Sequence, residues 1–356
     1  MTTGPRKRFT DWRTFVGVGL AIGLLVFSLR GISLDEVMGE IARANPILFL
    51  ASIVLAVGPM LVRAWRWKAL LEPVCPGTSF YSRFSTTMIG FMANNVLPAR
   101  VGEVARAYAL SRVEPITTIA SVGSLVVERL LDGVVVIAFL FIAMALPNFP
   151  GIGASMGLGT GMNTILAILG IITLIVLTMV IFPKTIVRLV DSITGLLLPA
   201  RFRRPIVEAL ETLLGGLSAL RHPKLLARAG LWSIGVWLVN TYAFWLGFKA
   251  FGIELPFSAA LFLQSLIALA VALPSAPGFF GLWEAAARLG LHEIWGVELS
   301  KALGFAIGFH IGSFLTVTIP GIYFTWRIGL SWGEMGKRTE GIEVTPIGGE
   351  GPEVSE

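Results

Sequence analysis

The sequence predicts an all-α membrane protein, a polytopic bundle of transmembrane helices. Three observations lead to this fold class: the composition, the length of the apolar segments, and two segments that proline and glycine interrupt. Of the 356 residues, 55% are hydrophobic and 14% are charged, whereas soluble domains carry about 25% charged residues. Because a soluble fold cannot bury so much apolar surface, we expect lipid to cover it.

A helix that crosses a bilayer needs about 20 predominantly apolar residues, and six segments approach or exceed that length. The first of them follows a basic cluster at Arg6, Lys7 and Arg8, as the apolar core of a signal peptide does. No small-residue cleavage site follows it, so we expect a retained anchor. The six predicted spans are Phe15–Leu29, Ile47–Val62, Ile116–Leu146, Thr164–Phe182, Ala229–Ala250 and Ala302–Trp326.

Two further segments, residues 80–112 and 256–295, are apolar but broken. The first contains the sequence NNVLPAR and the second contains LPSAPGFFGLWE. Proline removes a backbone donor and clashes with the preceding turn, so a continuous helix is not expected at either break. Two arrangements fit: six full spans with two re-entrant hairpins, or eight spans. Non-helical backbone at membrane depth is tolerated only where protein buries it or it lines a cavity, which favours the hairpins.

The basic residues predict which side of the membrane each loop occupies, because cytoplasmic loops are enriched in lysine and arginine. They concentrate before the first span, in residues 63–112 and 184–228, and after the last span. We therefore expect a bacterial-type inner or plasma membrane location, cytoplasmic termini, and hairpins that enter from opposite sides. Such a pair indicates an inverted repeat, which in transporters places the substrate site near the midplane between the halves.

The chain is predicted to have a cytoplasmic N-terminal segment, a membrane domain and a cytoplasmic tail. Within the membrane domain, apolar residues interleaved with Arg, Asp and Glu in residues 184–228 predict amphipathic helices on the cytoplasmic surface. The Gly- and Glu-rich end of the chain predicts disorder. The expected boundaries are residues 1–13, 14–327 and 328–356.

The longest apolar run contains three charged residues, Glu128, Arg129 and Asp132. A charged residue at the centre of a spanning helix costs roughly 3 kcal/mol on insertion scales, so each is a candidate functional residue. Glu128 and Asp132 are four residues apart and share one helix face, while Arg129 can bridge to another element. The group either contacts substrate or forms an internal ion-pair network that locks helices together.

The first break, residues 94–106, carries a second group of charges. Arg100, Glu103 and Arg106 recur every third residue, so a helix that begins after Pro98 places them roughly along one face. Guanidinium groups bind phosphate with two parallel hydrogen bonds, and a helix N-terminus adds a favourable field for an anion. A phospholipid headgroup fits such a site. The alternative is that Arg100 and Arg106 touch only interfacial lipid phosphates.

The second break carries Pro274, Pro277, Gly278, Gly281 and Glu284. Glycine permits unusual backbone angles and close helix approach. We expect Glu284 to pair with an arginine of the first hairpin or with Arg129. The alternative is a simple turn with a solvent-facing acid.

Two other groups have a plain structural interpretation. Arg63 and Arg66, close to tryptophans at the end of the second predicted span, are typical of an interfacial anchor, although they could also guide headgroups. His310 lies alone in the last span, where a hydrogen-bonded packing role is favoured over proton relay.

Several absences restrict the function. The single cysteine, Cys75, excludes a zinc site built on paired cysteines, and no metal or cofactor is expected. There is no G-x-x-x-x-G-K-[ST] loop, H-E-x-x-H pair or G-x-S-x-G elbow. The net charge of +6 is assigned to anionic lipid headgroups and not to nucleic acid.

Four motifs in this order resemble the lysylphosphatidylglycerol synthase transmembrane-region family, also called flippase-like. They are R-x-x-R-W from Arg63, N-x-x-x-P-x-R-x-G-E-x-x-R from Asn94, E-R-x-x-D from Glu128 and P-x-x-P-G-x-x-G-x-x-E from Pro274. Members of that family join this membrane module to a soluble aminoacyltransferase domain, and the membrane part is credited with moving the lipid between leaflets. The resemblance therefore implies the translocating half and no aminoacyltransferase activity.

The function predicted from the sequence is a lipid flippase that moves an anionic phospholipid or a polyprenyl-phosphate lipid. The alternatives are a membrane-embedded enzyme that modifies a lipid, with clustered carboxylates as acid and base, or a membrane partner of a separately encoded lipid synthase. In the flippase, arginines hold the headgroup while carboxylates balance charge and change partners as the hairpins alternate. The expected substrate-binding residues are Asn94, Asn95, Pro98, Arg100, Glu103, Arg106, Glu128, Arg129, Asp132, Pro274, Pro277, Gly278, Gly281 and Glu284, with Arg63 and Arg66 guiding headgroups.

Overall fold

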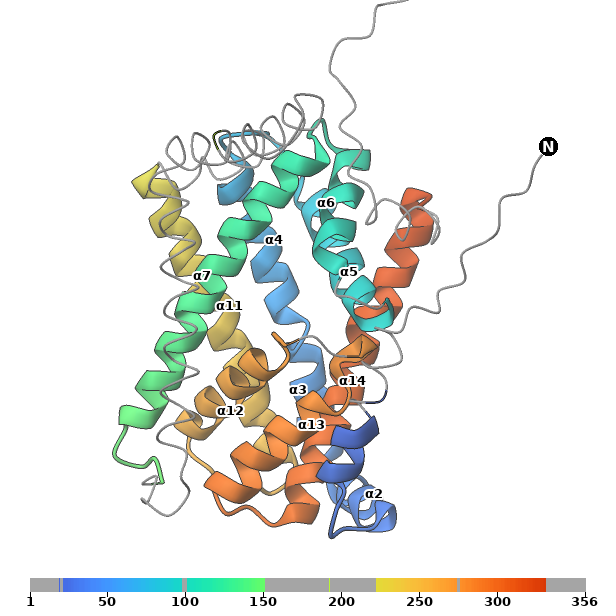
Figure 1. Cartoon of the computed structure of the whole chain (residues 1–356), viewed down its shortest axis with the longest axis vertical. Helices are drawn as coiled ribbons and strands as arrows, with labels where there is room; N and C mark the ends of the chain where they lie inside the picture. Colours follow the sequence, from blue (N-terminus) through green and yellow to red (C-terminus); the bar gives the residue numbers. More distant parts are fainter. Residues whose placement is uncertain are drawn as a thin grey trace, which may run out of the picture.

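The structure, a computed structural model, is helical in every regular element that it describes (Figure 1). This confirms the all-α fold class. The described residues are 19, 22–97, 101–150, 192, 222–273 and 276–330. Their elements are α2 (Leu34–Arg43), α3 (Pro46–Leu55), α4 (Gly58–Leu71), α5 (Phe80–Val96), α6 (Gly102–Val113), α7 (Thr118–Ala145), α11 (Pro223–Ala250), α12 (Phe257–Ala270), the short turns η4 (Pro277–Phe279) and η5 (Arg288–Ile294), α13 (Leu282–Ala287) and α14 (Leu299–Ile328).

Polar residues just before the helices fix where several of them begin. Ser33 and Glu36 form a reciprocal capping box at the start of α2, and the side chain of Asn45 accepts hydrogen bonds from the first turn of α3. Ser79 caps α5 in the same way. Each cap satisfies backbone N–H groups that the first turn of a helix leaves without a partner.

Three helical stretches in the described part of the chain are long and apolar enough to cross a membrane. They are α11, α14 and Pro46–Leu71, in which α3 and α4 follow one another. The predicted spans at 47–62, 229–250 and 302–326 are confirmed, except that the first of these continues to Leu71. The chain is therefore a polytopic helical membrane protein.

The other predicted spans have different outcomes. α7 has 28 residues and matches the segment predicted at 116–146. Because it contains three charged residues, it is less apolar than the three stretches named above. The span predicted at 164–182, part of the first span, most of the amphipathic region 184–228 and the tail beyond residue 330 lie outside the described residues.

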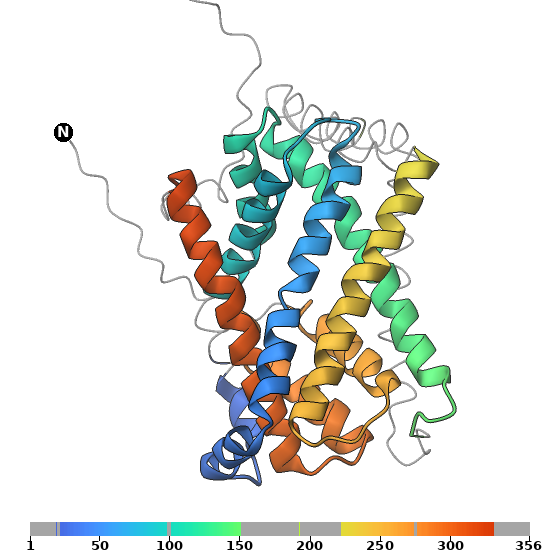
Figure 2. The same ribbon diagram turned by 180° about the vertical axis from the view of Figure 1, so that it is seen from behind.

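Two structural units follow the same plan. The first unit is α3 to α7 and the second unit is α11 to α14. Each consists of a long helical stretch, which is Pro46–Leu71 in the first unit and α11 in the second, followed by a broken pair of shorter helices and another long helix. α5 and α6 contact each other in the upper half of the molecule, while α12 and α13 contact each other in the lower half (Figures 1 and 2). α5 also contacts η4, so the break of the second unit lies against the first unit.

Two glycines allow α5 and α6 to approach closely. A Cβ atom on Gly102 would meet the carbonyl oxygen of Gly90, and a Cβ on Gly90 would lie 2.6 Å from the Cβ of Arg106. Real Cβ atoms do not tolerate such distances, so only glycine fits at this contact. The close approach brings the first turns of α6 against the middle of α5. α6 begins at Gly102.

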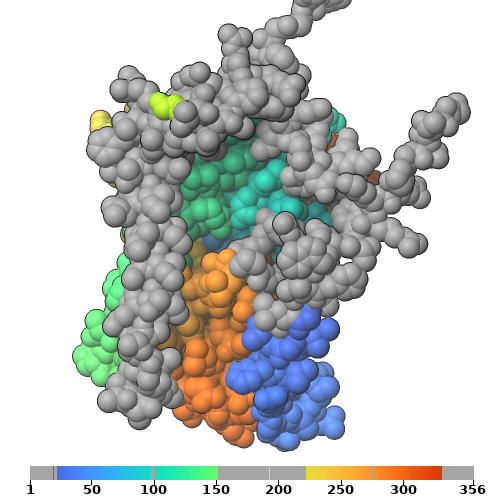
Figure 3. All heavy atoms as spheres, viewed as in Figure 1, coloured from blue at the N-terminus to red at the C-terminus, as the bar shows by residue number. Residues whose placement is uncertain are grey.

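Large apolar side chains point outward along the long helices. Ile47, Leu231, Ile319 and Trp326 are between 62% and 78% exposed, as expected for surfaces that contact lipid tails. In the space-filling view, α6 and α7 lie above α12 and α13 on the face shown (Figure 3). Phe244, Phe248, Phe305 and Phe309 fill the interior between α11 and α14, which fixes the second unit.

Candidate functional site

The site is built around two carboxylates on α7. Glu128 and Asp132 are 0% and 4% exposed, and their i, i+4 spacing places them on the same helix face. Both lie about 15 to 21 Å along α7 from its first residue, at 1.5 Å per residue, which is well inside this helix. Burying two carboxylates requires cationic partners from the neighbouring helices.

Asp132 receives hydrogen bonds from two helices. Arg63 Nη1 donates to Oδ2 at 2.6 Å and Arg66 Nη1 donates to Oδ1 at 2.5 Å, both from α4. Trp237 Nε1 on α11 donates to the same Oδ1 at 3.0 Å. With a further bond from Arg66 Nη2 to Oδ2 at 3.3 Å, four charge-assisted hydrogen bonds hold this carboxylate, and they tie α4, α7 and α11 together.

Glu128 lies among guanidinium groups from two helices. Arg106 Nη1 on α6 donates to Oε1 at 2.7 Å, and Arg66 Nη2 lies 3.1 Å from the same oxygen. The Arg106 guanidinium lies 3.8 Å from the centre of the Trp67 ring, a favourable cation–π contact. Trp67 Nε1 in turn donates to Ser124 Oγ at 2.9 Å. The carboxylate therefore connects α4 and α6 to α7.

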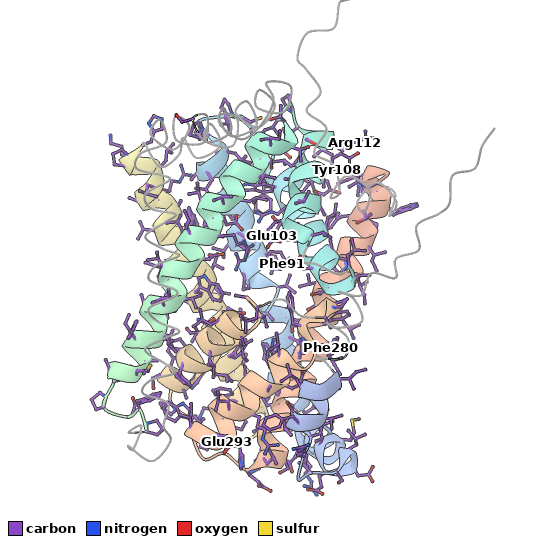
Figure 4. All side chains as sticks on the ribbon, in the orientation of Figure 1. Phe91, Glu103, Tyr108, Arg112, Phe280 and Glu293 are labelled. Atoms are coloured by element: carbon purple, nitrogen blue, oxygen red, sulfur yellow. The ribbon has the colours of Figure 1, made fainter. Side chains whose placement is uncertain are left out.

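Arg129 connects this buried group to the surface. Its side chain is 40% exposed, and its nitrogens lie 3.6 Å from Glu103 Oε1, 3.6 Å from Glu128 Oε1 and 3.9 Å from Asp132 Oδ2. Phe91 on α5 lies beneath both Arg63 and Arg129 at 5.2 and 5.8 Å from ring centre to guanidinium carbon. Figure 4 places Phe91 and Glu103 at similar heights midway along the molecule, with Phe280 below.

The arginine–carboxylate cluster consists of Arg63, Arg66, Glu103, Arg106, Glu128, Arg129 and Asp132. Its four arginines face three carboxylates, so the cluster of described residues carries a net positive charge. Some of its polar atoms are buried without a hydrogen-bond partner among the described residues, namely the donors Nε of Arg63, Nε of Arg66, and Nε and Nη2 of Arg106, and the acceptor Oε2 of Glu128. Buried donors without partners are costly, and together with the excess positive charge they suit the binding of an anion.

The two asparagines of the first break form hydrogen bonds that hold the neighbouring helices in place. Asn94 Oδ1 accepts a hydrogen bond from the N–H of Gly102 at 2.8 Å, so it caps the start of α6 across the break. Asn95 Nδ2 donates to Thr318 Oγ1 on α14 at 2.9 Å and links the two units. Pro98 and Arg100 lie outside the described residues.

The prediction for Glu284 is wrong in its partner. Among the described residues Glu284 pairs with His310 of α14, with Oε1 2.6 Å from Nδ1, and not with an arginine. It is 1% exposed, so it is not a solvent-facing acid either. Gly278 and Gly281 have φ of +71° and +86°, which explains why glycine occupies both positions. Pro277 begins η4, and Pro274 lies outside the described residues.

The interfacial interpretation of Arg63 and Arg66 is also wrong. They are 5% and 0% exposed and belong to the arginine–carboxylate cluster. An R-x-x-R pair before tryptophan looks the same in sequence whether it faces lipid headgroups or buried acids. Only the contact with the acids on α7 shows that these two arginines belong to the interior. The sequence analysis missed Phe91, Trp237 and Ser233, whose Oγ accepts a hydrogen bond from Arg66 Nη1 at 2.7 Å. His310 does form hydrogen bonds, as the packing role required.

No group of three or more His, Cys, Asp or Glu side chains that could hold a metal ion occurs in the described part of the chain. The acids of the cluster are surrounded by arginines, which compete with any cation. The cluster therefore suits an anionic ligand better than a metal ion.

The helical fold and the buried cluster define a multi-pass membrane protein with a charged centre inside its helices. The family model described as "Lysylphosphatidylglycerol synthase TM region" matches residues 14–321. The chain therefore belongs to this family, which confirms the resemblance carried by its four motifs.

Two named proteins are similar to parts of this chain. The UPF0104 membrane protein MJ1595 of Methanocaldococcus jannaschii is 28% identical over 110 residues, covering 30% of this chain and 33% of that protein. Glycosyltransferase AglD of Haloferax volcanii is 25% identical over 337 residues, covering 85% of this chain and 52% of that protein. The chain thus spans about a third of the length of the first relative and about half of the length of the second.

Proposed function

We propose that this protein carries an anionic lipid, either a phospholipid or a lipid-linked phosphate, between the leaflets of the membrane. The observation that carries the proposal is the arginine–carboxylate cluster, which holds more positive than negative charge inside the helices. An intramembrane charge group is expensive and marks a substrate pathway more often than a plain packing contact. A phosphate headgroup supplies the missing negative charge.

Arg129 is the residue best placed to meet the headgroup first. It is the most exposed arginine of the cluster, and its ion pairs at 3.6 to 3.9 Å are longer than the shortest pair of each buried arginine, at 2.5 to 2.7 Å. Longer pairs are exchanged for a phosphate at lower cost, because less is lost when they break. Arg106, with two nitrogens that have no partner among the described residues, then supplies a deeper contact.

The two broken pairs of helices are proposed to be re-entrant hairpins of an inverted repeat. Support comes from the placement of α5 and α6 in one half of the molecule and of α12 and α13 in the other. The contact between α5 and η4 brings the two breaks together. Rocking of one unit against the other then exposes the cluster to alternate sides, with the acyl chains left in the bilayer.

A translocation assay in proteoliposomes tests the proposal. Fluorescent phosphatidylglycerol, a polyprenyl phosphate and zwitterionic phosphatidylcholine are compared, and faster movement of an anionic lipid than in empty vesicles is expected. Arg129→Gln is expected to slow that movement at least tenfold, whereas Arg112→Gln, an exposed arginine near the end of α6, leaves it unchanged. A failure of every anionic lipid to move, or equal slowing by the two variants, contradicts the proposal.

A second candidate function is favoured by the relative named as a glycosyltransferase, which this chain matches along 85% of its own length. In this function the membrane module presents a lipid-linked substrate to a transferase, or modifies the lipid itself. Mass spectrometry of lipids incubated with the purified protein distinguishes the two. A new lipid species favours the enzyme, whereas a change of leaflet without a change of mass favours the carrier.

A further inference from the structure

The break of the second unit holds two buried titratable groups that the arginine–carboxylate cluster does not use. Glu284 on α13 and His310 on α14 are 1% and 4% exposed. His310 Nδ1 lies 2.6 Å from Glu284 Oε1, and His310 Nε2 lies 2.9 Å from the carbonyl oxygen of Gly278. The N–H of Gly281 donates to Glu284 Oε2 at 2.7 Å.

The hydrogen-bond geometry of Glu284 and His310 requires one shared proton between them. A carbonyl oxygen only accepts, so the Nε2 of His310 must carry a hydrogen to bond Gly278. A neutral imidazole then has a lone pair at Nδ1, and an ionised Glu284 also offers only lone pairs. Two acceptors do not lie 2.6 Å apart, so a further proton lies between Nδ1 and Oε1, bound to either atom.

Aromatic rings pack against the pair. The Trp283 ring stacks on His310 with centres 5.0 Å apart, and the Phe280 ring lies 4.7 Å away. Among the described residues no salt bridge links Glu284 or His310 to another charged group. The charge of the pair is therefore set by its own proton.

The charged groups of the neighbouring elements are occupied elsewhere or lie at a distance. α12 carries no titratable side chain, and the groups of η5 bond to one another or to backbone oxygens. Those on α14 itself lie more than two turns from His310. On η5 these groups are Arg288, His292 and Glu293, and on α14 they are Lys301, Tyr323 and Arg327. α5 carries Tyr81 and Arg83, and Arg83 bonds to Ala64 and Thr78. α2 carries Asp35, Glu36, Glu40 and Arg43, and Glu40 pairs with Arg43. α6 carries Glu103, Arg106, Tyr108 and Arg112, and Glu103 and Arg106 belong to the arginine–carboxylate cluster. α11 carries Lys224, Arg228, Tyr242 and Lys249, and Lys249 pairs with Glu254.

The same pair holds a strained turn in place. Gly278 and Gly281 have positive φ, and Phe279 between them has a φ of +62°, a conformation that bulky side chains rarely adopt. His310 binds one end of this turn and Glu284 the other. Because η4 contacts α5, a change in the turn is transmitted to the first unit.

We propose that Glu284 and His310 form a proton-binding site whose occupancy holds the 278–281 turn closed. On release, the N–H of the imidazolium or the O–H of the carboxylic acid loses its proton to water, which leaves a neutral imidazole and a carboxylate. Their facing lone pairs then push the two side chains apart and release the turn. A second part of the proposal rests on the proposed carrier function: this proton is the ion whose movement is coupled to lipid movement.

Nuclear magnetic resonance of the full chain in lipid nanodiscs tests the proton site without any transport. With ¹⁵N in the rings of the three histidines, a strongly downfield proton resonance is expected for His310, whichever atom carries the proton, and it disappears as the pH rises. Glu284→Gln removes it, because the amide can donate to Nδ1 without a labile proton. His292→Gln, at a half-buried histidine of η5 whose Nδ1 lies 2.8 Å from the carbonyl oxygen of Val297, leaves it in place. A His310 that lacks this resonance at every pH overturns the site.

A pH gradient across proteoliposomes tests the coupling. One proton moved per lipid allows a leaflet ratio of roughly tenfold for each pH unit of gradient, and Glu284→Gln abolishes this dependence while His292→Gln keeps it. Lipid movement that ignores the gradient in the unmodified protein overturns the coupling and leaves the carrier function standing. If no lipid moves at all, the carrier function fails, while the resonance experiment still decides the proton site.

Discussion

The two units of the molecule are built alike, yet they bury different kinds of charged group. In the first unit, guanidinium groups from α4 and α6 surround Glu128 and Asp132. Arginine keeps its charge at any physiological pH, so the positive charge of this unit is permanent. In the second unit the buried acid Glu284 faces His310, and histidine changes charge with small shifts in pH. One architecture thus places a permanent charge in one half and a titratable pair in the other.

The difference shows how two units built on one plan can divide their tasks. A permanent cationic group suits the binding of an anion, and a titratable pair suits a response to protons. The contact between α5 and η4 joins them.

Side-specific labelling gives an all-or-none result for the opposite orientation of the units. Glu72→Cys and Arg112→Cys flank the first hairpin, and Glu254→Cys and Glu298→Cys flank the second; all four are introduced without Cys75. If both hairpins are re-entrant, a membrane-impermeant maleimide labels the first pair from one side and the second pair from the other. In a protein with eight spans, the two members of each pair react from opposite sides.

Removing an acid of the first unit is expected to cost the most stability. Asp132→Ala leaves Arg63 and Arg66 buried without their main partner, which costs about 3 to 5 kcal/mol in the free energy of unfolding. Glu254→Ala breaks an exposed pair with Lys249 and is expected to cost at most about 1 kcal/mol. Denaturation in detergent micelles measures both, and equal losses contradict a central role for the cluster.

The close contact of α5 and α6 predicts a smaller effect. Gly102→Ala places a methyl group against the backbone of Gly90, and the forced separation is expected to cost about 1 to 3 kcal/mol. The matched control is Gly133→Ala in α7, where a Cβ meets nothing within 4 Å. There alanine is expected to stabilise the helix by up to about 1 kcal/mol. Similar losses at the two glycines contradict this account of the hairpin.

The smallest effect concerns Cys75, in the loop before α5. Burial, and to a lesser degree the nearby Glu114 carboxylate, raise the pKa of its thiol. The thiolate is the reactive form, so maleimide labelling of Cys75 is expected to be slower at neutral pH than that of an exposed cysteine. Raising the pH accelerates it, because the thiol ionises only near its raised pKa. Glu114→Gln lowers that pKa and is expected to speed labelling, and an unchanged rate contradicts the role of Glu114.

Much of this architecture can be predicted from the sequence, because it depends on local composition. The spans at 47–62, 229–250 and 302–326 and the broken segments follow from apolar length and from proline and glycine, which act within a few residues. The i, i+4 spacing of Glu128 and Asp132 also follows, since helix geometry fixes it. The membership of the family was carried by four motifs that lie in one order along the chain.

The partners of the charged groups were decided only by the tertiary structure. Arg63 looks like a membrane anchor in sequence, and Glu284 looks like a partner for arginine, yet the first binds Asp132 and the second binds His310. The residues that meet are 69 and 26 positions apart. The sequence shows which charged groups need a partner if they are buried. Which acids and bases come within hydrogen-bond distance of one another is decided only by how the helices pack.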